Sequence, residues 1–200
     1  MSNRSRKQKR PTRADEYAVT RADQLRESVS PRRHDIIDQI SATGPMSVRE
    51  LAHMLGVAPS SLYYHVERLC EVGLLKEVGT RQEATKPERV YDTPARRVTL
   101  LDALQQPRNA DVMTDIVGAL CKQARKDFAG SFDAGHRETA GARRNTRFFR
   151  LVGRPDAAAR AAINQHLDAI TEIMVASAGN DAPRVSMMWV MAPLPGADDS

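Results

Sequence analysis

The sequence predicts an α+β, mainly helical fold, and three observations support this prediction. Apolar residues recur at helical spacing in several segments between residues 30 and 176. Residues 74–78 and 89–91 are rich in apolar and β-branched residues and flank a polar stretch, as expected of a β hairpin. The apolar fraction of 41% can supply a core for 200 residues, a length that allows one large or two small domains.

The N-terminal part begins with residues 1–13, which contain six Lys or Arg residues and no acid. This basic arm cannot bury apolar surface, so we expect it to be disordered. Residues 14–29 show a weak helical pattern. A stronger helix follows, with Ser30 as its cap, Pro31 at its first position and Gly44 at its end. We expect its inner face to carry Ile36, Ile37 and Ile40.

Two short helices joined by a turn come next. Ser47 followed three residues later by Glu50 is a capping box, which satisfies free amides at a helix start. Gly56 ends that helix, and Pro59 suits the first turn of a second helix that runs to about residue 72. We expect these apolar residues to face the core: Leu51, Met54 and Leu55 in the first helix, and Leu62, Val66 and Leu69 in the second.

A hairpin follows the second helix, with strands at residues 74–78 and 89–91 and a long polar tip at 79–88. Helix, turn, helix and hairpin in this order predict a winged helix-turn-helix. Arg81, Lys86 and Arg89 give the wing a positive side that fits the sugar-phosphate backbone of DNA. The alternative is a solvated loop whose charges contact nothing.

The second helix of such a unit enters the major groove with its N-terminal end. That end carries small hydroxyls and longer polar side chains, which can bond to base edges or phosphates. The residues that we expect to contact DNA are Ser60, Ser61, Tyr63, Tyr64 and Arg68 on this helix, and Arg81, Lys86 and Arg89 on the wing. The basic arm could follow a DNA groove or only keep the protein in solution.

Three stretches carry a family resemblance: residues 48–56, the run Ser61-Leu62-Tyr63-Tyr64-His65-Val66, and residues 72–75. With the hairpin ending near residues 90–91, they resemble ArsR-like winged-helix transcriptional regulators of bacteria, especially the branch with a "SLYYH" recognition helix. The resemblance covers about residues 24–94. It implies a homodimer that represses or activates promoters and responds to a small ligand or metal. One departure is Glu67, where relatives often have a basic residue.

The C-terminal part has a different character. Residues 109–128 form a long amphipathic pattern whose broad apolar side could pack on its own chain or on a second subunit. We expect Val112, Ile116 and Leu120 to form a dimer seam there. Residues 147–153 and 185–192 are predicted strands, which flank a helix at 156–176. The residues expected inside that helix are Ile163, Leu167, Ile170 and Met174.

A two-stranded sheet is marginal alone, so this small α+β unit should lean on the long helix or on a partner chain. Methionines gather near Trp189 in the last predicted strand, where they could line an adaptable ligand pocket. Ordinary core filling is the simpler interpretation. The predicted division is therefore a basic arm at 1–13, a DNA-binding domain at 14–95, and a dimerisation or sensing domain at 96–200.

Other functions find little support in the sequence. The five histidines and the cysteines Cys70 and Cys121 form no metal-ligand spacing, and no phosphate loop, nucleophile elbow or paired-carboxylate motif occurs. We therefore expect no enzyme, no cofactor and no resident metal. Few cysteines and no long apolar run favour a cytoplasmic chain without a membrane span.

The net charge of +5 favours a polyanionic partner. The sequence predicts a homodimeric, sequence-specific transcriptional regulator that binds double-stranded DNA and has an unidentified effector, if any. The alternative is a structural or protein-interaction module that uses the winged-helix face.

Overall fold

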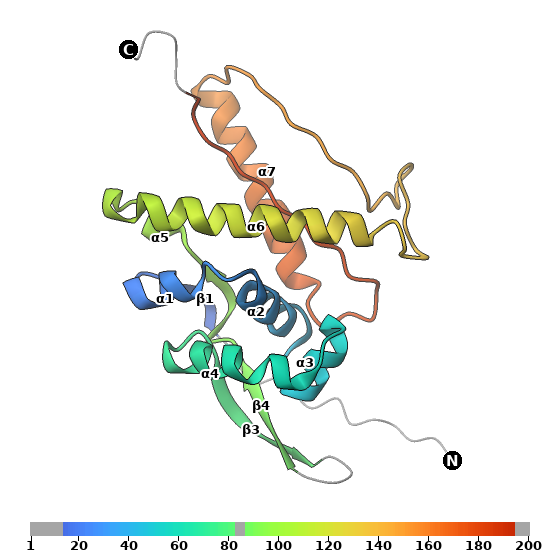
Figure 1. The fold of residues 1–200 in the computed structure, drawn as a ribbon. Helices are drawn as coiled ribbons and strands as arrows, with labels where there is room; N and C mark the ends of the chain where they lie inside the picture. Colours follow the sequence, from blue (N-terminus) through green and yellow to red (C-terminus); the bar gives the residue numbers. More distant parts are fainter. Residues whose placement is uncertain (1–13, 83–86, 195–200) are drawn as a thin grey trace.

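The computed structural model describes residues 14–82 and 87–194 and shows a mixed α+β fold (Figure 1). Its helices are α1 (Ala22–Glu27), α2 (Pro31–Thr43), α3 (Val48–Leu55), α4 (Tyr63–Glu71), α5 (Leu101–Leu104), α6 (Ala110–Gly130) and α7 (Ala157–Ala176). Its strands are β1 (Ala14–Ala18), β2 (Met46–Ser47), β3 (Lys76–Gln82), β4 (Pro87–Asp92) and β5 (Ala95–Thr99). Two 3-10 turns, η1 (Pro59–Ser61) and η2 (Pro107–Asn109), precede α4 and α6.

The predicted helix ends at α2 and α3 are confirmed. Pro31 begins α2, and Gly44 follows its last residue, but the side chain of Ser30, which precedes α2, makes no cap hydrogen bond. At α3 the Ser47 Oγ accepts a hydrogen bond from the Glu50 amide at 3.2 Å, and the Ser47 amide donates to the Glu50 carboxylate at 2.7 Å. Gly56 ends α3 with a φ of 65°, a left-handed conformation that an L side chain rarely adopts.

Residues 14–29 differ from the single weak helix that we expected. Residues Ala14–Ala18 form β1, which pairs in parallel with β5, and only Ala22–Glu27 are helical. The local sequence pattern could not reveal this strand, because its partner β5 lies some 80 residues away in the sequence. Arg97 of β5 also donates a hydrogen bond to Glu16 of β1. Val19, directly after β1, is fully buried.

The hairpin is longer than predicted. In an antiparallel sheet of order β2-β4-β3, β3 extends to Gln82 and β4 begins at Pro87, so most of the expected tip at 79–88 is strand. Its polar residues can form strands because cross-strand backbone bonds, rather than burial, hold the ladder. Lys86 lies outside the described residues.

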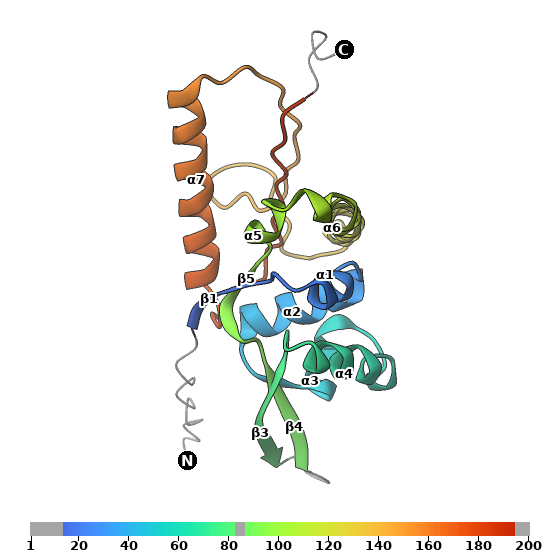
Figure 2. The ribbon, with the colours of Figure 1, turned by 90° about the vertical axis from the view of Figure 1, so that its left-hand side faces the viewer.

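One hydrophobic core holds helices α1 to α6 together. Helices α1 to α4 pack below α6, which crosses over α1 and α2 (Figures 1 and 2). Leu62, Val66 and Leu69 of the second short helix are buried as expected, but Met54 and Leu55 of α3 are only partly buried. The core continues into Ala103, Met113 and Ile116, beyond the predicted boundary at residues 95 and 96.

The three residues of the expected dimer seam lie in or against the core of their own chain. Ile116 is 1% exposed inside the core of its own chain, and Val112 and Leu120 pack against that core. The broad apolar side of α6 is therefore covered by the chain's own helices. The sequence allowed α6 to pack on its own chain or on a second subunit, and the structure shows packing on its own chain.

The segment after α6 departs furthest from expectation. Residues 147–153 and 185–192 belong to no strand or helix, and α7 has no buried residue. Ile163, Leu167, Ile170 and Met174 are thus half-buried or exposed rather than inside. The apolar character of these segments predicts strands, but a sheet needs a bonding partner, and the described chain supplies none to either segment. None of the described helices is both long and apolar enough to cross a membrane.

Candidate functional site

The candidate site is the outer surface of α3, η1 and α4 together with the hairpin of β3 and β4. Burial of Leu62, Val66 and Leu69 fixes which side of α4 faces solvent. Tyr63 and Tyr64 are consequently 53% and 62% exposed at the N-terminal end of α4.

The two serines of η1 are also exposed, in keeping with the predicted DNA-contacting set. The Ser61 hydroxyl, however, donates to the carbonyl of Ala58 at 2.7 Å and stabilises the turn. Within the described residues, the Ser60 hydroxyl makes no such hydrogen bond. The set of hydroxyls facing solvent is therefore Ser60, Tyr63 and Tyr64.

Tyr64 is oriented by its neighbours. The guanidinium carbon of Arg33 on α2 lies 6.0 Å from the centre of the Tyr64 ring, within cation–π range. His65 contacts the same ring edge-on, with 5.6 Å between ring centres. The side chain is thus exposed yet contacts two neighbouring side chains, which lowers the entropy lost on binding a partner. Arg33 was not predicted, because its role depends on how α2 and α4 pack.

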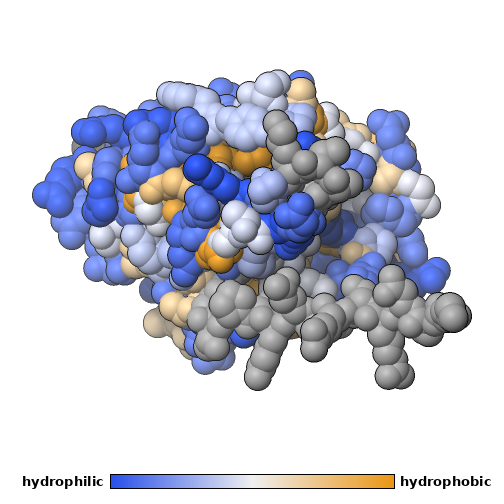
Figure 3. Space-filling view, turned by 90° about the horizontal axis from the view of Figure 1, so that it is seen from below, coloured by the Kyte–Doolittle hydropathy of each residue, from blue (hydrophilic) through white to orange (hydrophobic). Residues whose placement is uncertain are grey.

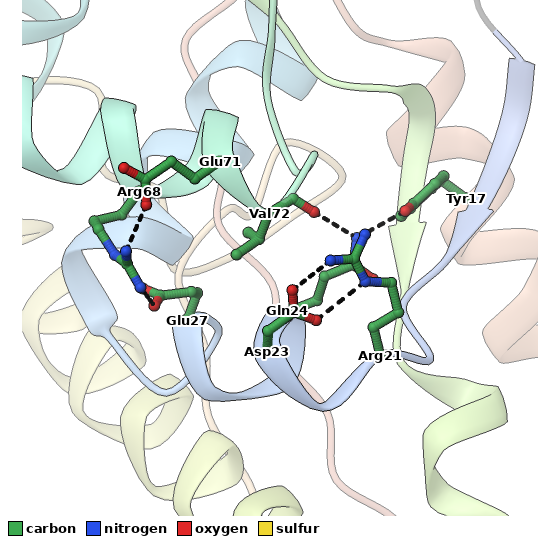
Figure 4. A network of polar contacts seen from close by, with 8 residues as sticks. All are labelled: Tyr17, Arg21, Asp23, Gln24, Glu27, Arg68, Glu71 and Val72. Carbon is green, nitrogen blue, oxygen red and sulfur yellow. Dashed lines mark hydrogen bonds and ion pairs between the residues drawn. The ribbon is translucent and has the colours of Figure 1, made fainter.

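Arg68 points toward α1 rather than into solvent. Its guanidinium donates to the buried Glu27 carboxylate at 2.7 Å and also pairs with Glu71 (Figure 4). Glu27 accepts a second ion pair from Arg33 at 2.6 Å. The hydrogen bond and charge of Glu27 raise the pKa of Arg68. Arg68 therefore joins α4 to the rest of the domain, and its predicted role in contacting DNA is not reflected in its position.

Gln24 fixes the other end of α4. Its amide nitrogen donates to the Val72 carbonyl at 2.8 Å and to the Tyr17 hydroxyl at 2.7 Å (Figure 4). Gln24 is 1% exposed, and these bonds satisfy its buried amide nitrogen, whereas its Oε1 has no hydrogen-bond partner among the described residues. The sequence pattern gave no signal for this residue.

Arg81 lies on β3 and faces the helices instead of a loop tip. It pairs with Glu50, the acid of the α3 capping box, and donates to the Pro45 carbonyl at 3.5 Å. Glu50 thereby connects the start of α3 to the wing. Because its charge is already neutralised, Arg81 offers less attraction to a phosphate than the sequence suggested.

The remaining arginines of the wing and α3 are also paired. Arg89 lies 3.7 Å from Glu77 across the hairpin and is 70% exposed. Arg49, which sequence reasoning missed, lies 2.9 Å from Glu88. A hollow of about 300 Å³ adjoins this pair and is lined by Ser47, Arg49, Glu50, His53 and Glu88.

Four arginines of this face are therefore paired with carboxylates. Arg49, Arg68, Arg81 and Arg89 each have a carboxylate within 4.0 Å. Figure 3 views the molecule from the side on which the hairpin ends, and most of that face is hydrophilic. The described part of the face thus presents exposed hydroxyls and rings among paired charges.

Two further groups bear on chemistry. Burial raises the pKa of the Cys70 thiol and lowers that of His34, so both favour their neutral forms. In residues 14–82 and 87–194, no three His, Cys, Asp or Glu side chains are grouped closely enough to hold a metal ion.

Comparisons with known proteins add a family match. The model of a family described as HVO_A0114 matches residues 28–95, from the end of α1 to the start of β5. Among solved structures, the chain is similar to the "Crystal structure of RV1404 from Mycobacterium tuberculosis", at 18% identity and a TM-score of 0.27. That similarity covers 76% of this chain and 82% of the other. No curated protein matches the chain.

Proposed function

We propose that residues 30–92 form a winged helix-turn-helix and that the chain is a homodimeric, sequence-specific transcriptional regulator that binds double-stranded DNA. In this proposal α3 supports α4, the N-terminal end of α4 reads bases, and β3 and β4 form the wing. The proposal retains the resemblance to ArsR-like regulators. The C-terminal part would serve dimerisation or sensing of an effector.

The observation that carries the proposal is the pair of exposed tyrosines at the start of α4. Large aromatic side chains are costly to leave in water without a partner, yet Tyr63 and Tyr64 are more than half exposed. Their phenol groups can bond to base edges or phosphates, and their rings can pack on a thymine methyl group. The orientation of Tyr64 by Arg33 and His65 is what a reading residue needs.

The paired arginines favour a second candidate, a module that binds a protein through the same face. A DNA phosphate would have to displace Glu50 from Arg81 and Glu77 from Arg89, which reduces the gain from each contact. A protein partner could instead use the tyrosines as anchors, since tyrosine is enriched at the centres of interfaces. Binding to DNA separates the two candidates.

The test is a selection of binding sites from random double-stranded DNA, followed by affinity measurements on the selected sequence. Tyr64→Ala should weaken specific binding by about 1–3 kcal/mol, or roughly 5- to 150-fold, with nearly unchanged thermal stability. Tyr64→Phe separates the hydroxyl from the ring. Leu104→Ala, at an exposed residue on α5, is the control and should bind as the wild type does.

Enrichment of no sequence, together with wild-type binding that does not depend on salt, would reject the DNA proposal in favour of a protein partner. Enrichment with full affinity in Tyr64→Ala would keep DNA binding but remove this residue from base reading.

A further inference from the structure

The arginines that follow α6 differ from those of the winged-helix face. Residues 136–154 contain six arginines and a single acid, Glu138. All six are exposed, and only Arg143 has a carboxylate within 4.0 Å among the described residues, that of Glu138 at 3.3 Å. This segment lies beyond the C-terminal end of α6, whereas the hairpin of β3 and β4 points away from that helix (Figure 1). A surface with several unpaired guanidinium groups therefore lies apart from the winged-helix face.

Hydrogen bonds around Asn145 close the first part of this segment into a loop. The Asn145 side chain donates to the His136 carbonyl at 2.8 Å and accepts from the Glu138 amide at 2.9 Å. The Asn145 amide donates to the Glu138 carbonyl, also at 2.9 Å. Because these bonds join the two sides of the loop, Arg137 and Arg147 leave it at the same end.

Phenylalanine rings gather at that end. Phe132 and Phe148 each contact Phe128 of α6 edge-on, with ring centres 5.5 and 5.6 Å away. They nevertheless remain 58% and 83% exposed, and Phe149 is 66% exposed. The contacts with α6 place the rings, while much of their surface stays open to solvent.

Guanidinium groups accompany these rings. The guanidinium carbon of Arg137 lies 4.5 Å from the centre of the Phe132 ring, and that of Arg147 lies 5.6 Å from the centre of the Phe149 ring. Both distances are within cation–π range. Arg150 follows Phe149 directly in the chain and is exposed. Cations and rings thus alternate over the arginine–phenylalanine surface, which consists of Phe132, Arg137, Arg147, Phe148, Phe149 and Arg150.

This alternation indicates which class of partner fits the surface. A single-stranded nucleic acid alternates an anionic phosphate with a flat base, and an open base can stack on an aromatic ring. A duplex keeps its bases stacked on one another and offers no free base face. A lipid bilayer would need contiguous apolar area, which Arg147 and Arg150 interrupt on either side of the two neighbouring phenylalanines.

We propose that the arginine–phenylalanine surface binds single-stranded nucleic acid, with its guanidinium groups on phosphates and the rings of Phe148 and Phe149 stacked on bases. The proposed function concerns duplex DNA and the start of α4, whereas this surface belongs to the C-terminal part and serves a different form of nucleic acid. Stacking tolerates any base, so we expect binding without marked sequence preference.

The test measures the fluorescence anisotropy of labelled oligo(dT) and oligo(U) of about ten nucleotides, a length that one such surface can cover. Phe149→Ala in the full chain should weaken binding by roughly 5- to 150-fold, because one stacked base is lost. Leu151→Ala is the matched control, since Leu151 is 82% exposed in the same segment but has no flat ring. It should bind as the wild type does.

The salt dependence tests the guanidinium groups separately. Replacing Arg147 and Arg150 by glutamine should make the salt slope shallower by about 0.7 for each phosphate contact that is lost. The control replaces Arg26 of α1 and Arg108 of η2 by glutamine, which removes the same charge from exposed residues. Those elements lie toward the N-terminal end of α6, away from the proposed surface (Figure 1). The control should keep the wild-type slope.

Each variant is compared with the wild type, because residues 1–13 are also basic and can attract an oligonucleotide. Wild-type affinity in Phe149→Ala would overturn the inference, and so would an equal loss in Leu151→Ala, which would indicate a general apolar contact. Equal salt slopes in the two double variants would also overturn it. Higher affinity for oligo(U) or for oligo(dT) would support it and show which sugar the surface prefers.

A membrane is tested in parallel with vesicles of phosphatidylcholine and phosphatidylserine. Vesicle binding that requires Phe149, together with oligonucleotide binding that does not, would assign the surface to a membrane and overturn the inference. Oligo(dT) and oligo(U) form no duplex with themselves, so these results stand whether or not the winged-helix face binds duplex DNA.

Discussion

Ile116 of α6 decides whether that helix belongs to the core of one chain or to a seam between two. It is 1% exposed within the cluster that includes residues of α1 and α2. The substitution Ile116→Ala leaves backbone and charge unchanged and removes three carbon atoms from this core. We expect it to lower the stability of the folded chain without changing its oligomeric state.

The size of the effect follows from burial. Each buried methyl or methylene group contributes about 0.8 kcal/mol, so the loss of three removes about 2.4 kcal/mol. The cavity left behind adds to this loss, because neighbouring helices relax only in part, and the total for such substitutions is about 2–5 kcal/mol. For a domain whose free energy of unfolding is about 5–15 kcal/mol, this is a large fraction.

Urea denaturation followed by circular dichroism measures the difference. Ile173→Ala is the matched control, since Ile173 is 68% exposed on α7 and its loss should change stability by less than about 0.5 kcal/mol. The reasoning is refuted if Ile116→Ala costs no more than the control. It is also refuted if the difference in stability between the wild type and Ile116→Ala disappears when both proteins are diluted. A residue in a seam between chains would stabilise only the associated chains.

Three further predictions follow from the charges. Glu27→Gln leaves two guanidinium groups without their shared buried carboxylate, so it should lower the free energy of unfolding by about 3 kcal/mol. Glu71→Gln, at the exposed end of the network, is the control and should lower it by less than about 1 kcal/mol. Equal losses in the two variants would contradict this prediction. Burial holds the pKa of His34 below its ordinary 6.5, so the unfolded chain takes up a proton at higher pH than the folded chain. Stability should therefore fall as pH decreases through about 6.5, and less so in His34→Gln; parallel pH profiles would argue against the assignment. Glu77→Gln frees Arg89 from its ion pair. If the wing binds DNA, this variant should have a higher affinity for all DNA sequences, and its salt slope should be steeper by up to about 0.9 per freed contact. An unchanged salt slope would exclude a contact between Arg89 and a phosphate.

The sequence predicts correctly the helix ends that depend on residues close together in the chain. Two helix ends are fixed by local hydrogen bonds, those of the capping box at Ser47 and Glu50 and that of the Gly56 amide after α3. The start of α2 is fixed by the φ of Pro31 and by its missing N–H. These features could be predicted because each depends on neighbours within four residues. The exposed tyrosines of α4 followed from the same helical spacing.

Non-local pairings could not be predicted in this way. β1 is a strand because β5 bonds to it, and Arg68 and Arg81 are directed inward because carboxylates on α1 and α3 attract them. The sequence shows that these arginines are charged but not which partner each one has. The same limit explains residues 147–153 and 185–192, whose apolar character predicts strands but does not place a partner beside them.

The parallel pairing of β1 with β5 has a consequence for how the chain folds during its synthesis. Glu16 bonds Arg97, a residue 81 positions later, so β1 leaves the ribosome long before its partner exists. The helices from α2 to α4 and the hairpin rely on closer contacts, and local contacts form before long loops close. The N-terminal strand therefore waits unpaired through the synthesis of the intervening segment, and its docking completes the unit only after β5 has emerged.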